Sequence, residues 1–393
     1  MLPQAIDATL RAAFDDNFSS GGELGASVSV WQDGRELANF AAGWCDRDQT
    51  QAWTADTPVL FWSATKGLAS ASVLHALQEG GLNPITLRVA KLWPEFAQAG
   101  KEDVTVGQLM SHQAGLSVLT EAIEVWDYDR VVAALAAEAP HWVLGHGHGY
   151  HPRTFGFLMD ELVRRITGVT LRNYWRRIFA EPLGIDVWIG VPEEDVDRVA
   201  PVFPAKGAPS KDDLFYHEFF RAGSFTARAF TSPRGLHSAA ALNKPEALTV
   251  GFPGFGGVGT ARGLAKFYAM LAAGGSLDGR RYFEPASIDH MAATLVQGPD
   301  RVLHLETAFS CGFMRDPLDP NGKKIRKIFG PSLSAFGHPG AGGSHAFADP
   351  ENGLAFAYVM NQMEPGVLPS AKAMRLVDAT YGREAFHRGT GLN

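Results

Sequence analysis

The sequence has few of the features that place a chain in a membrane, on nucleic acid or in a disulfide-linked fold. Only two of its 393 residues are cysteine, Cys45 and Cys311, and they form no spacing motif, so we expect a reduced, cytoplasmic protein. Acidic residues outnumber basic ones by 42 to 35, and the net charge of -7 argues against nucleic acid or an anionic membrane as a partner. No apolar run reaches about 18 residues, so no membrane span is predicted. Residues 1–17 lack the basic start, apolar run and cleavage site of a secretory signal.

The pattern Gly-x-Ser-x-Gly is also absent, so the strand-to-helix nucleophile elbow of the α/β-hydrolases is not predicted. What the chain does have is a composition that suits a globular protein. Hydrophobic residues make up 46% of it and charged residues 20%, which is enough to bury a sizeable core. Its length favours two domains, or one domain with a large insertion.

Predicted strands lie at both ends of the chain and predicted helices in the middle. Residues 26–43 alternate as a hairpin, and later alternation predicts strands at 307–314, 333–337, 344–349 and 354–360. Helical spacing predicts helices at 68–78, 104–110, 129–139, 154–167, 260–273 and 368–381. We therefore predict an α+β fold in which residues 1–70 and 285–393 form an antiparallel sheet domain and residues 71–284 a mostly helical insertion. Within the insertion, residues 191–253 are predicted to be irregular, either a lid over a pocket or a packed surface excursion.

Ser63 and Lys66 form a Ser-x-x-Lys pattern at the start of a predicted helix, and no other serine in the chain has a lysine at this spacing. Residues three apart on a helix share a face, so the hydroxyl and the amine would lie one turn apart. The helix N-terminus offers free N–H groups and partial positive charge, and Lys66 can take the hydroxyl proton if burial keeps its amine neutral. The alternative is a capping serine with a lysine in solvent. The Phe-Trp pair before Ser63 and the small-residue helix after it favour a buried catalytic site.

Residues 142–151, Trp-Val-Leu-Gly-His-Gly-His-Gly-Tyr-His, have the most unusual local composition in the chain. Tyr150 could serve as a general base if two nearby cations lowered its pKa, or it could be a buried phenol bonded to the backbone. The set His146, His148 and His151 resembles the histidine loop of binuclear zinc hydrolases, with tyrosine where their aspartate stands. Because the predicted surroundings are helical, a glycine-rich loop with solvated histidines is preferred and no metal is predicted.

Residues 337–344, Gly-His-Pro-Gly-Ala-Gly-Gly-Ser, precede a predicted strand near the C-terminal end. Glycines this dense let a backbone pass close to a ligand, and a free N–H at a strand edge can serve an oxyanion hole. A tight turn with a capping histidine is the alternative. His338 could instead complete a Ser-His-Asp triad with Ser63, but no aspartate in the sequence stands out as its partner.

In order along the chain, these three pieces resemble the motifs of the serine β-lactamases and penicillin-binding proteins. Ser63 and Lys66 are similar to their Ser-x-x-Lys, Tyr150 to the tyrosine of their second motif, and residues 338–340 to their Lys-Thr-Gly. The His-x-Gly variant followed by Gly-Gly is similar to the family VIII carboxylesterases. The resemblance covers residues 25–363 and implies a β-lactamase/transpeptidase-like fold, an antiparallel sheet flanked by helices with an inserted helical domain.

Two positions depart from the β-lactamase pattern. Class C β-lactamases have Tyr-x-Asn in the second motif, and the asparagine amide holds a substrate carbonyl, whereas Pro152 occupies that position here. Their third-motif lysine pairs with the β-lactam carboxylate, and His338 in its place is a cation only part of the time near neutral pH. Both changes suit a neutral ester better than a β-lactam.

The resemblance also implies a role for each matched residue. Ser63 would be the nucleophile, and Lys66 and Tyr150 would share the base role, with Tyr150 carrying the proton to the leaving alcohol. The backbone N–H groups of Ser63 and Ala341 would form the oxyanion hole. The residues expected to contact substrate are His338, Gly340, Trp62 and Pro152. No cofactor is implied.

The expected function is hydrolysis of short- to medium-chain carboxylic esters through an acyl-enzyme. The alternatives are a weak β-lactamase or D,D-peptidase activity, acyl transfer to an alcohol or amine, and zinc-dependent hydrolysis at the histidine loop. The expected partner is a small ester, and assembly into a homo-oligomer stays open. Several aromatic residues are candidates for the wall of an acyl pocket, although core or lid packing is the more ordinary reason for them: Trp126, Phe215, Tyr216, Phe219 and Phe220.

Overall fold

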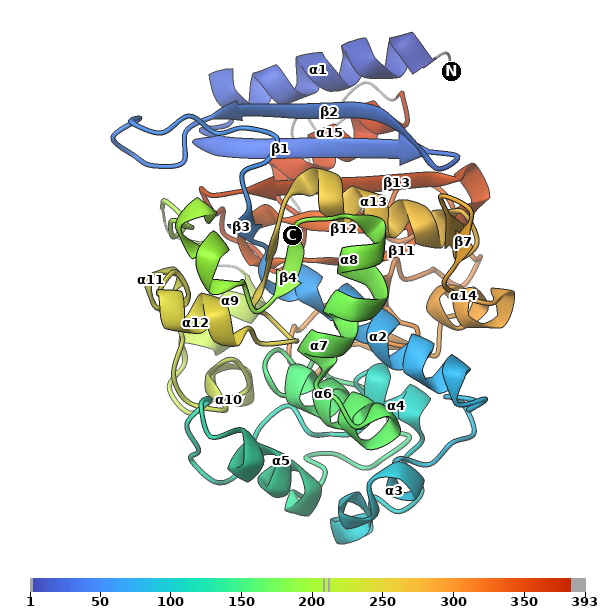
Figure 1. Cartoon of the computed structure of the whole chain (residues 1–393). Coiled ribbons are helices and arrows are strands. Elements are labelled where there is room, and N and C mark those ends of the chain that lie inside the picture. The colour runs from blue at the N-terminus through green and yellow to red at the C-terminus, as the bar shows by residue number, and fades with distance from the viewer. Residues whose placement is uncertain (1–2, 208, 211–212, 383–393) are drawn as a thin grey trace.

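A computed structural model describes residues 3–207, 209–210 and 213–382, and one eight-stranded sheet organises this part of the chain (Figure 1). Its strand order is β2-β1-β13-β12-β11-β10-β9-β8, with every neighbouring pair antiparallel. The strands are β1 (Gly25–Gln32), β2 (Arg35–Gly43), β8 (Val296–Pro299), β9 (Glu306–Phe309), β10 (Met314–Arg315), β11 (Phe336–Pro339), β12 (His345–Asp349) and β13 (Leu354–Met360). The N-terminal hairpin thus pairs with the C-terminal strands, as predicted.

The two faces of the sheet carry side chains of different size. Along β13, Phe356 and Tyr358 point to one face, where α1 (Pro3–Ser19) and α15 (Ala371–Thr380) cover them. Ala355 and Ala357 point to the other face, where the short side chains let α13 (Ala261–Ala272) pack closely. Both faces are therefore buried, and β13 is buried along its whole length.

The remaining helices form a second body below the sheet in Figure 1. At its centre α2 (Thr65–Glu79) is buried over thirteen of its fifteen residues and contacts both α6 and β11, so it joins the two bodies. The other helices are α3 (Val89–Leu92), α4 (Val106–Met110), α5 (Tyr128–Ala137), α6 (Thr154–Thr167), α7 (Leu171–Trp175), α8 (Glu181–Leu183), α9 (Leu214–Phe220), α10 (Phe225–Thr231), α11 (Ala239–Leu242), α12 (Pro245–Val250) and α14 (Pro285–Ala292).

Two smaller sheets complete the architecture, and neither is predicted by the sequence. One consists of β3 (Val59–Leu60), β5 (Gly257–Gly259) and β4 (Val187–Ile189), in the order β3-β5-β4. The other is the two-stranded ribbon β6 (Ser276–Leu277) and β7 (Arg280–Arg281). The three-stranded sheet lies beside the start of α2, because β3 ends only a few residues before that helix begins.

Several predicted boundaries are wrong. The single strand expected at 307–314 is two antiparallel strands, β9 and β10, because the chain turns at Gly312 with a φ of 80°. The stretch 191–253, expected to be irregular, contains the four short helices α9 to α12. Helix α13 packs on the sheet although the sequence interpretation places it in the 71–284 insertion. The strand expected at 333–337 is β11, which begins only at Phe336, and the other predicted segments overlap elements of the expected type.

Cys45 and Cys311 are unpaired, buried thiols. A helix both long and apolar enough to cross a bilayer does not occur among the residues that the structure describes.

Candidate active site

Ser63 lies in a 3-10 turn, η1 (Trp62–Ala64), that runs directly into α2. Trp62, just before the serine, has a positive φ of 49°, a conformation that a bulky residue adopts only when its surroundings enforce it. The Thr65 hydroxyl supplies part of that constraint. It donates to the Trp62 carbonyl and accepts the Gly257 N–H at 2.8 Å, which ties the turn to β5. The position of Ser63 is thereby fixed by the small sheet.

Lys66 points back toward Ser63, as the helical spacing predicts. Its Nζ lies 3.2 Å from the Ser63 Oγ, 2.9 Å from the Pro152 carbonyl and 2.7 Å from the Gly254 carbonyl. Pro152 therefore contributes a backbone acceptor that holds the lysine, although the sequence interpretation expects it to contact substrate. Gly254 is a partner that the sequence does not indicate.

The charge state of Lys66 follows from this environment. The side chain is fully buried, and among the described residues no carboxylate forms an ion pair with it. Burial, with a smaller contribution from the Arg153 charge, holds the pKa of Lys66 well below its ordinary value. A neutral amine has two N–H groups and one lone pair. In that neutral form, an amine that donates its two N–H groups to Pro152 and Gly254 would turn its lone pair toward the Ser63 hydroxyl.

Tyr150 stands on the other side of the cleft, with its ring 4.8 Å from the Lys66 Nζ. Its backbone N–H donates to both carboxylate oxygens of Asp300, at 3.1 and 3.2 Å. Burial raises the pKa of the phenol, the Asp300 charge adds to that rise, and a hydrogen bond with Ser63 opposes it. The side chains beside the ring, Lys66 and His338, both have lowered pKa values, so the described residues do not provide the two cations that would turn Tyr150 into a phenolate. Tyr150 is a protonated phenol beside Ser63.

His338 lies on β11 and faces Tyr150, with 5.8 Å between the ring centroids. Its Nδ1 donates to the Pro339 carbonyl at 2.7 Å, while its Nε2 is buried with no partner among the described residues. Burial lowers the pKa of His338 to about 3, so the imidazole is neutral. The structure describes no carboxylate hydrogen-bonded to its ring, so a Ser-His-Asp arrangement does not form. His338 lines the cleft as a neutral acceptor.

Two backbone N–H groups border the cleft near Ser63. Ser63 and Ala341 each lie at the start of a 3-10 turn, η1 and η5 (Ala341–Gly343), where N–H groups have no acceptor within the turn. Gly340, one residue earlier, passes so close to this region that a Cβ on it would come within 2.1 Å of the Phe61 carbonyl oxygen. Only glycine fits at that approach, which brings the Ala341 backbone beside the turn that carries Ser63.

The cleft itself is narrow and mostly apolar, with a cavity volume of about 40 Å³. Besides Ser63, Tyr150, His338, Pro339 and Ala341, its walls are Phe230, Leu303, Met314 and Val367. The four apolar side chains come from three distant segments and are not predicted by the sequence. Of the four residues expected to contact substrate, His338 lines the cleft, whereas Trp62, Pro152 and Gly340 are not among the lining residues.

The stretch 191–253 does reach the cleft, through Phe230 on α10. The aromatic residues proposed for an acyl pocket do not line it. Four of them, Phe215, Tyr216, Phe219 and Phe220, stack on one another along α9. Trp126 packs on Phe252 in a different part of the helical body.

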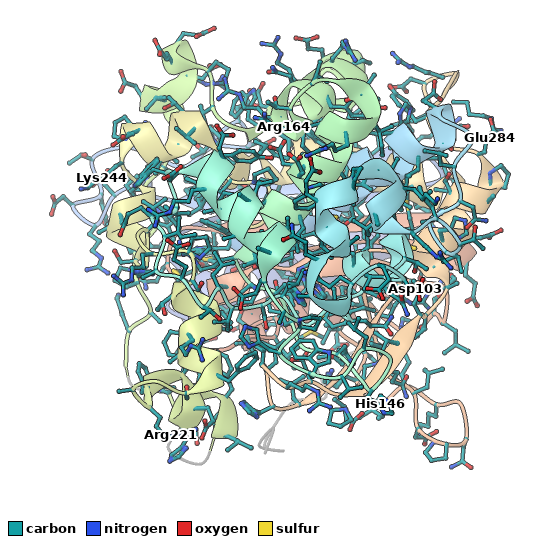
Figure 2. The ribbon with its side chains drawn as sticks, turned by 90° about the horizontal axis from the view of Figure 1, so that it is seen from below. Asp103, His146, Arg164, Arg221, Lys244 and Glu284 are labelled. Carbon is teal, nitrogen blue, oxygen red and sulfur yellow. The ribbon has the colours of Figure 1, made fainter. Side chains whose placement is uncertain are left out.

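The histidine loop has no metal-binding arrangement. Both ring nitrogens of His151 are occupied by the chain itself, with Nδ1 on the Gly149 carbonyl and Nε2 accepting the Leu116 N–H. His148 is buried against Thr307, with 2.6 Å between its Nε2 and the Thr307 hydroxyl. His146 is an exposed residue at the surface, labelled in Figure 2. Within residues 3–382, apart from the three positions left undescribed, no group of three His, Cys, Asp or Glu could hold a metal ion.

Asp300 is the main feature of the site that sequence reasoning misses. Its buried carboxylate accepts not only the Tyr150 N–H but also those of Val302 and Leu303, at 2.8 and 2.9 Å, and the Thr307 hydroxyl at 3.1 Å. It thus joins the loop that carries Tyr150 to the loop that places Leu303 in the cleft. A single aspartate in a loop has no local pattern that could reveal this role.

Comparison with known proteins fits this geometry. The family model described as Beta-lactamase matches residues 10–381. The chain belongs to the beta-lactamase family. It is 35% identical over 367 residues to "Esterase/beta-lactamase LipL" of Mycobacterium tuberculosis, an alignment that covers 91% of this chain and 81% of that protein.

Solved structures of this family superpose over nearly the whole chain. A penicillin-binding protein homolog from Caulobacter crescentus matches with a TM-score of 0.83 and 38% identity, over 95% of this chain and 96% of that one. A family VIII carboxylesterase matches with a TM-score of 0.85 and 34% identity, over 96% and 97%. This beta-lactamase family member therefore has the β-lactamase/transpeptidase-like fold that its motifs predict, and it is a hydrolase of the beta-lactamase/esterase family.

Proposed function

We propose that this beta-lactamase family member is a serine carboxylesterase that cleaves small esters through an acyl-enzyme. The observation that carries the proposal is the 3.2 Å contact between the Ser63 hydroxyl and a buried Lys66 amine held below its ordinary pKa. A neutral amine at that distance is a base for the hydroxyl proton.

In the first half-reaction, the Ser63 oxygen attacks the ester carbonyl carbon while Lys66 takes the hydroxyl proton. The carbonyl oxygen becomes an oxyanion beside the N–H groups of Ser63 and Ala341, each worth about 3 kcal/mol of transition-state stabilisation. The bond to the leaving oxygen then breaks, and the leaving alkoxide receives a proton. Tyr150 is the donor best suited to that step, because it is a phenol beside Ser63 and can be reprotonated from Lys66.

In the second half-reaction, water attacks the acyl-enzyme and its proton passes to the same pair of groups. The tetrahedral intermediate collapses to release the carboxylic acid and restore the Ser63 hydroxyl. Lys66 and Tyr150 act as one coupled unit, so their apparent pKa values belong to the pair. No step requires a group that the chain does not supply.

The lining of the cleft supports small, uncharged acyl groups. Its volume of about 40 Å³ is far below the range of about 300–1,000 Å³ typical of small-molecule sites. A longer acyl chain needs more room between the apolar walls Phe230, Leu303, Met314 and Val367 than an acetyl group does. We therefore propose short-chain esters as the best substrates, with activity falling as the acyl chain lengthens.

A β-lactamase activity is the second candidate, because a relative carries that word in its name. A β-lactam presents a carboxylate, and neutral His338 offers no permanent cation to pair with it. A missing charge-assisted hydrogen bond of about 1.5–3 kcal/mol lowers turnover roughly 10- to 100-fold. We propose that cephalosporins are at best poor substrates. Transfer of the acyl group to an alcohol or amine uses the same intermediate and is tested by adding such acceptors.

The test compares hydrolysis of p-nitrophenyl acetate, butyrate and octanoate by wild type and Ser63→Ala, each with and without EDTA. The proposal predicts full activity in EDTA, loss in Ser63→Ala, and the highest kcat/KM for acetate or butyrate. Ser72→Ala is the matched control and should keep its activity, because Ser72 is a buried serine on the same helix whose hydroxyl donates to the Leu68 carbonyl one turn earlier. Ester hydrolysis that survives Ser63→Ala would overturn the assignment of Ser63 as the nucleophile. Loss of hydrolysis in EDTA would overturn the metal-free mechanism.

A further inference from the structure

A second cleft lies in the helical body and shares no lining residue with the cleft around Ser63. Its volume is about 390 Å³, within the range of about 300–1,000 Å³ typical of small-molecule sites. It opens between the start of α5, the middle of α6, the start of α7 and residues 250–253. Figure 2 views this helical side of the molecule and labels Arg164 on it, well away from His146.

Four of the side chains that line this cleft are aromatic. Trp126, Tyr128, Phe157 and Phe252 all line it. The Trp126 side chain packs edge-on against Phe252, with 5.5 Å between the ring centroids, and yet remains 41% exposed. A large aromatic residue left this open at the mouth of a cavity is suited to stacking against a flat apolar ligand.

The charges of the cleft do not balance. Arg164 is paired with Asp160 at 3.1 Å, and Asp160 also accepts the Leu171 N–H, so that pair is satisfied. Arg172 differs, because it donates to the Thr249 carbonyl at 2.7 Å and makes no ion pair with any carboxylate in the described part of the chain. The lining therefore carries one uncompensated positive charge in a protein whose net charge is -7. A guanidinium with free N–H groups matches a carboxylate.

We propose that this cleft is a binding site for a small aromatic monocarboxylate. The carboxylate pairs with Arg172, and the ring lies against the exposed surface of Trp126. The single uncompensated charge selects a monoanion, and the aromatic walls select a flat apolar body. Nothing in the catalytic cleft supplies this combination, because its lining contains no cationic side chain and only neutral His338.

The location of the cleft connects it to Lys66. Its two facing walls are α6 and residues 250–253. Pro152 lies just before α6 and Gly254 directly follows the other wall, and these two carbonyls hold the Lys66 amine. The walls touch at this end, where a Cβ on Gly156 would meet the Gly254 nitrogen at 2.4 Å. An occupant that moves either wall would therefore change the spacing of the two carbonyls around the Lys66 amine.

The test is isothermal titration of the full chain with 2-naphthoate as the probe. Wild type is expected to bind with one site, and Arg172→Gln to bind at least about tenfold more weakly, since a charge-assisted hydrogen bond is lost. Arg172→Lys keeps the charge and recovers part of the affinity. Arg177→Gln, an exposed arginine that does not line the cleft, is the matched control and binds like wild type. The neutral isostere 2-naphthalenemethanol binds wild type weakly and is insensitive to Arg172→Gln.

Equal 2-naphthoate affinity in wild type and Arg172→Gln, or no binding to either, overturns the proposal. Because binding is measured without catalysis, this result does not depend on the esterase assignment. A second arm measures ester hydrolysis against pH with and without saturating 2-naphthoate, and it rests on the proposed function. A shift of the acidic limb in wild type that disappears in Arg172→Gln supports the connection to Lys66. Binding of 2-naphthoate without such a shift overturns the connection to Lys66, while the proposed binding site itself stands.

Discussion

The Lys66 amine lies 3.2 Å from the Ser63 hydroxyl and is held by two backbone carbonyls in place of a carboxylate. A lysine usually donates hydrogen bonds and carries a positive charge at the same time, and this arrangement keeps the first property while it disfavours the second. The carbonyls satisfy the N–H groups without stabilising the positive charge as strongly as a carboxylate would, and burial penalises that charge. The result is a lysine suited to accept a proton rather than to anchor an anion.

Replacing Lys66 by methionine removes the base and keeps much of the side-chain volume. We expect kcat/KM for p-nitrophenyl butyrate to fall by roughly 10²- to 10⁴-fold, the usual contribution of a general base. The free energy of unfolding should fall by about 1–3 kcal/mol, because the buried Pro152 and Gly254 carbonyls lose their hydrogen-bond donor. Steady-state kinetics and urea unfolding on the same preparations check both parts. Retention of wild-type kcat/KM would remove Lys66 from the mechanism.

The lowered pKa of Lys66 also predicts how the free energy of unfolding depends on pH. The pKa of Lys66 in the native state is well below its ordinary value of 10.5, so between the two values the unfolded chain binds the extra proton. Stability from this group therefore rises with pH through that window, with a slope of up to about 1.4 kcal/mol per pH unit. We expect the difference in unfolding free energy between wild type and Lys66→Met to shift in favour of wild type from about pH 7 to pH 10. A difference that is flat with pH would mean that Lys66 is charged in the native state.

The same pKa direction governs the acidic limb of activity. Below its native pKa Lys66 is protonated and cannot accept the Ser63 proton, so kcat/KM should rise with pH through that value and then level off. The raised pKa of Tyr150 keeps the phenol protonated, so the plateau should extend at least to about pH 10. Rates of a neutral ester, corrected for spontaneous hydrolysis, give the profile. Activity that falls again just above neutral pH would show that the essential acid has a pKa near neutral, which would exclude the Tyr150 phenol as the proton donor.

The sequence predicts the parts of this site that depend on local spacing. Ser63 and Lys66 meet because residues three apart on a helix share a face, and the strands around His338 follow from alternation of apolar residues. Strand β8 escapes prediction because Val-Gln-Gly-Pro shows little alternation and is only partly buried. The short helices of 191–253 escape it because none of them is longer than seven residues.

Contacts made through the backbone leave no trace in the sequence. Any residue can offer the carbonyls that Pro152 and Gly254 give to Lys66, so residue type does not reveal them. Asp300 binds the Tyr150 N–H across 150 positions of the chain, and a lone loop aspartate is ordinarily read as solvated. These features depend on how the two bodies pack, which is a property of the whole fold.

Ala341→Pro tests the oxyanion hole without changing a side chain in the chemistry. Residue 341 begins a 3-10 turn, and Gly340 before it is extended with φ -110° and ψ 151°, so proline is compatible with the backbone there. The substitution removes the N–H donor and places the proline Cδ where that hydrogen was. We expect kcat to fall roughly 10²- to 10³-fold with little change in melting temperature. Ala341→Gly keeps the N–H and should retain most of the activity, and equal kcat for the proline and glycine variants would exclude this N–H as a donor.

Asp300→Asn tests whether the aspartate positions Tyr150. The carboxylate accepts three backbone N–H groups and one hydroxyl, and an amide of the same shape presents two hydrogens to donors that need an acceptor. We expect a loss of about 1–3 kcal/mol in unfolding free energy and a fall of roughly 10- to 100-fold in kcat, with a smaller change in KM. Asp289→Asn, at an exposed position, is the matched control and should change neither quantity. If Asp300→Asn loses stability but keeps kcat, the aspartate serves the fold alone, and Tyr150 is held in place by its ring contacts with His112 and Phe309.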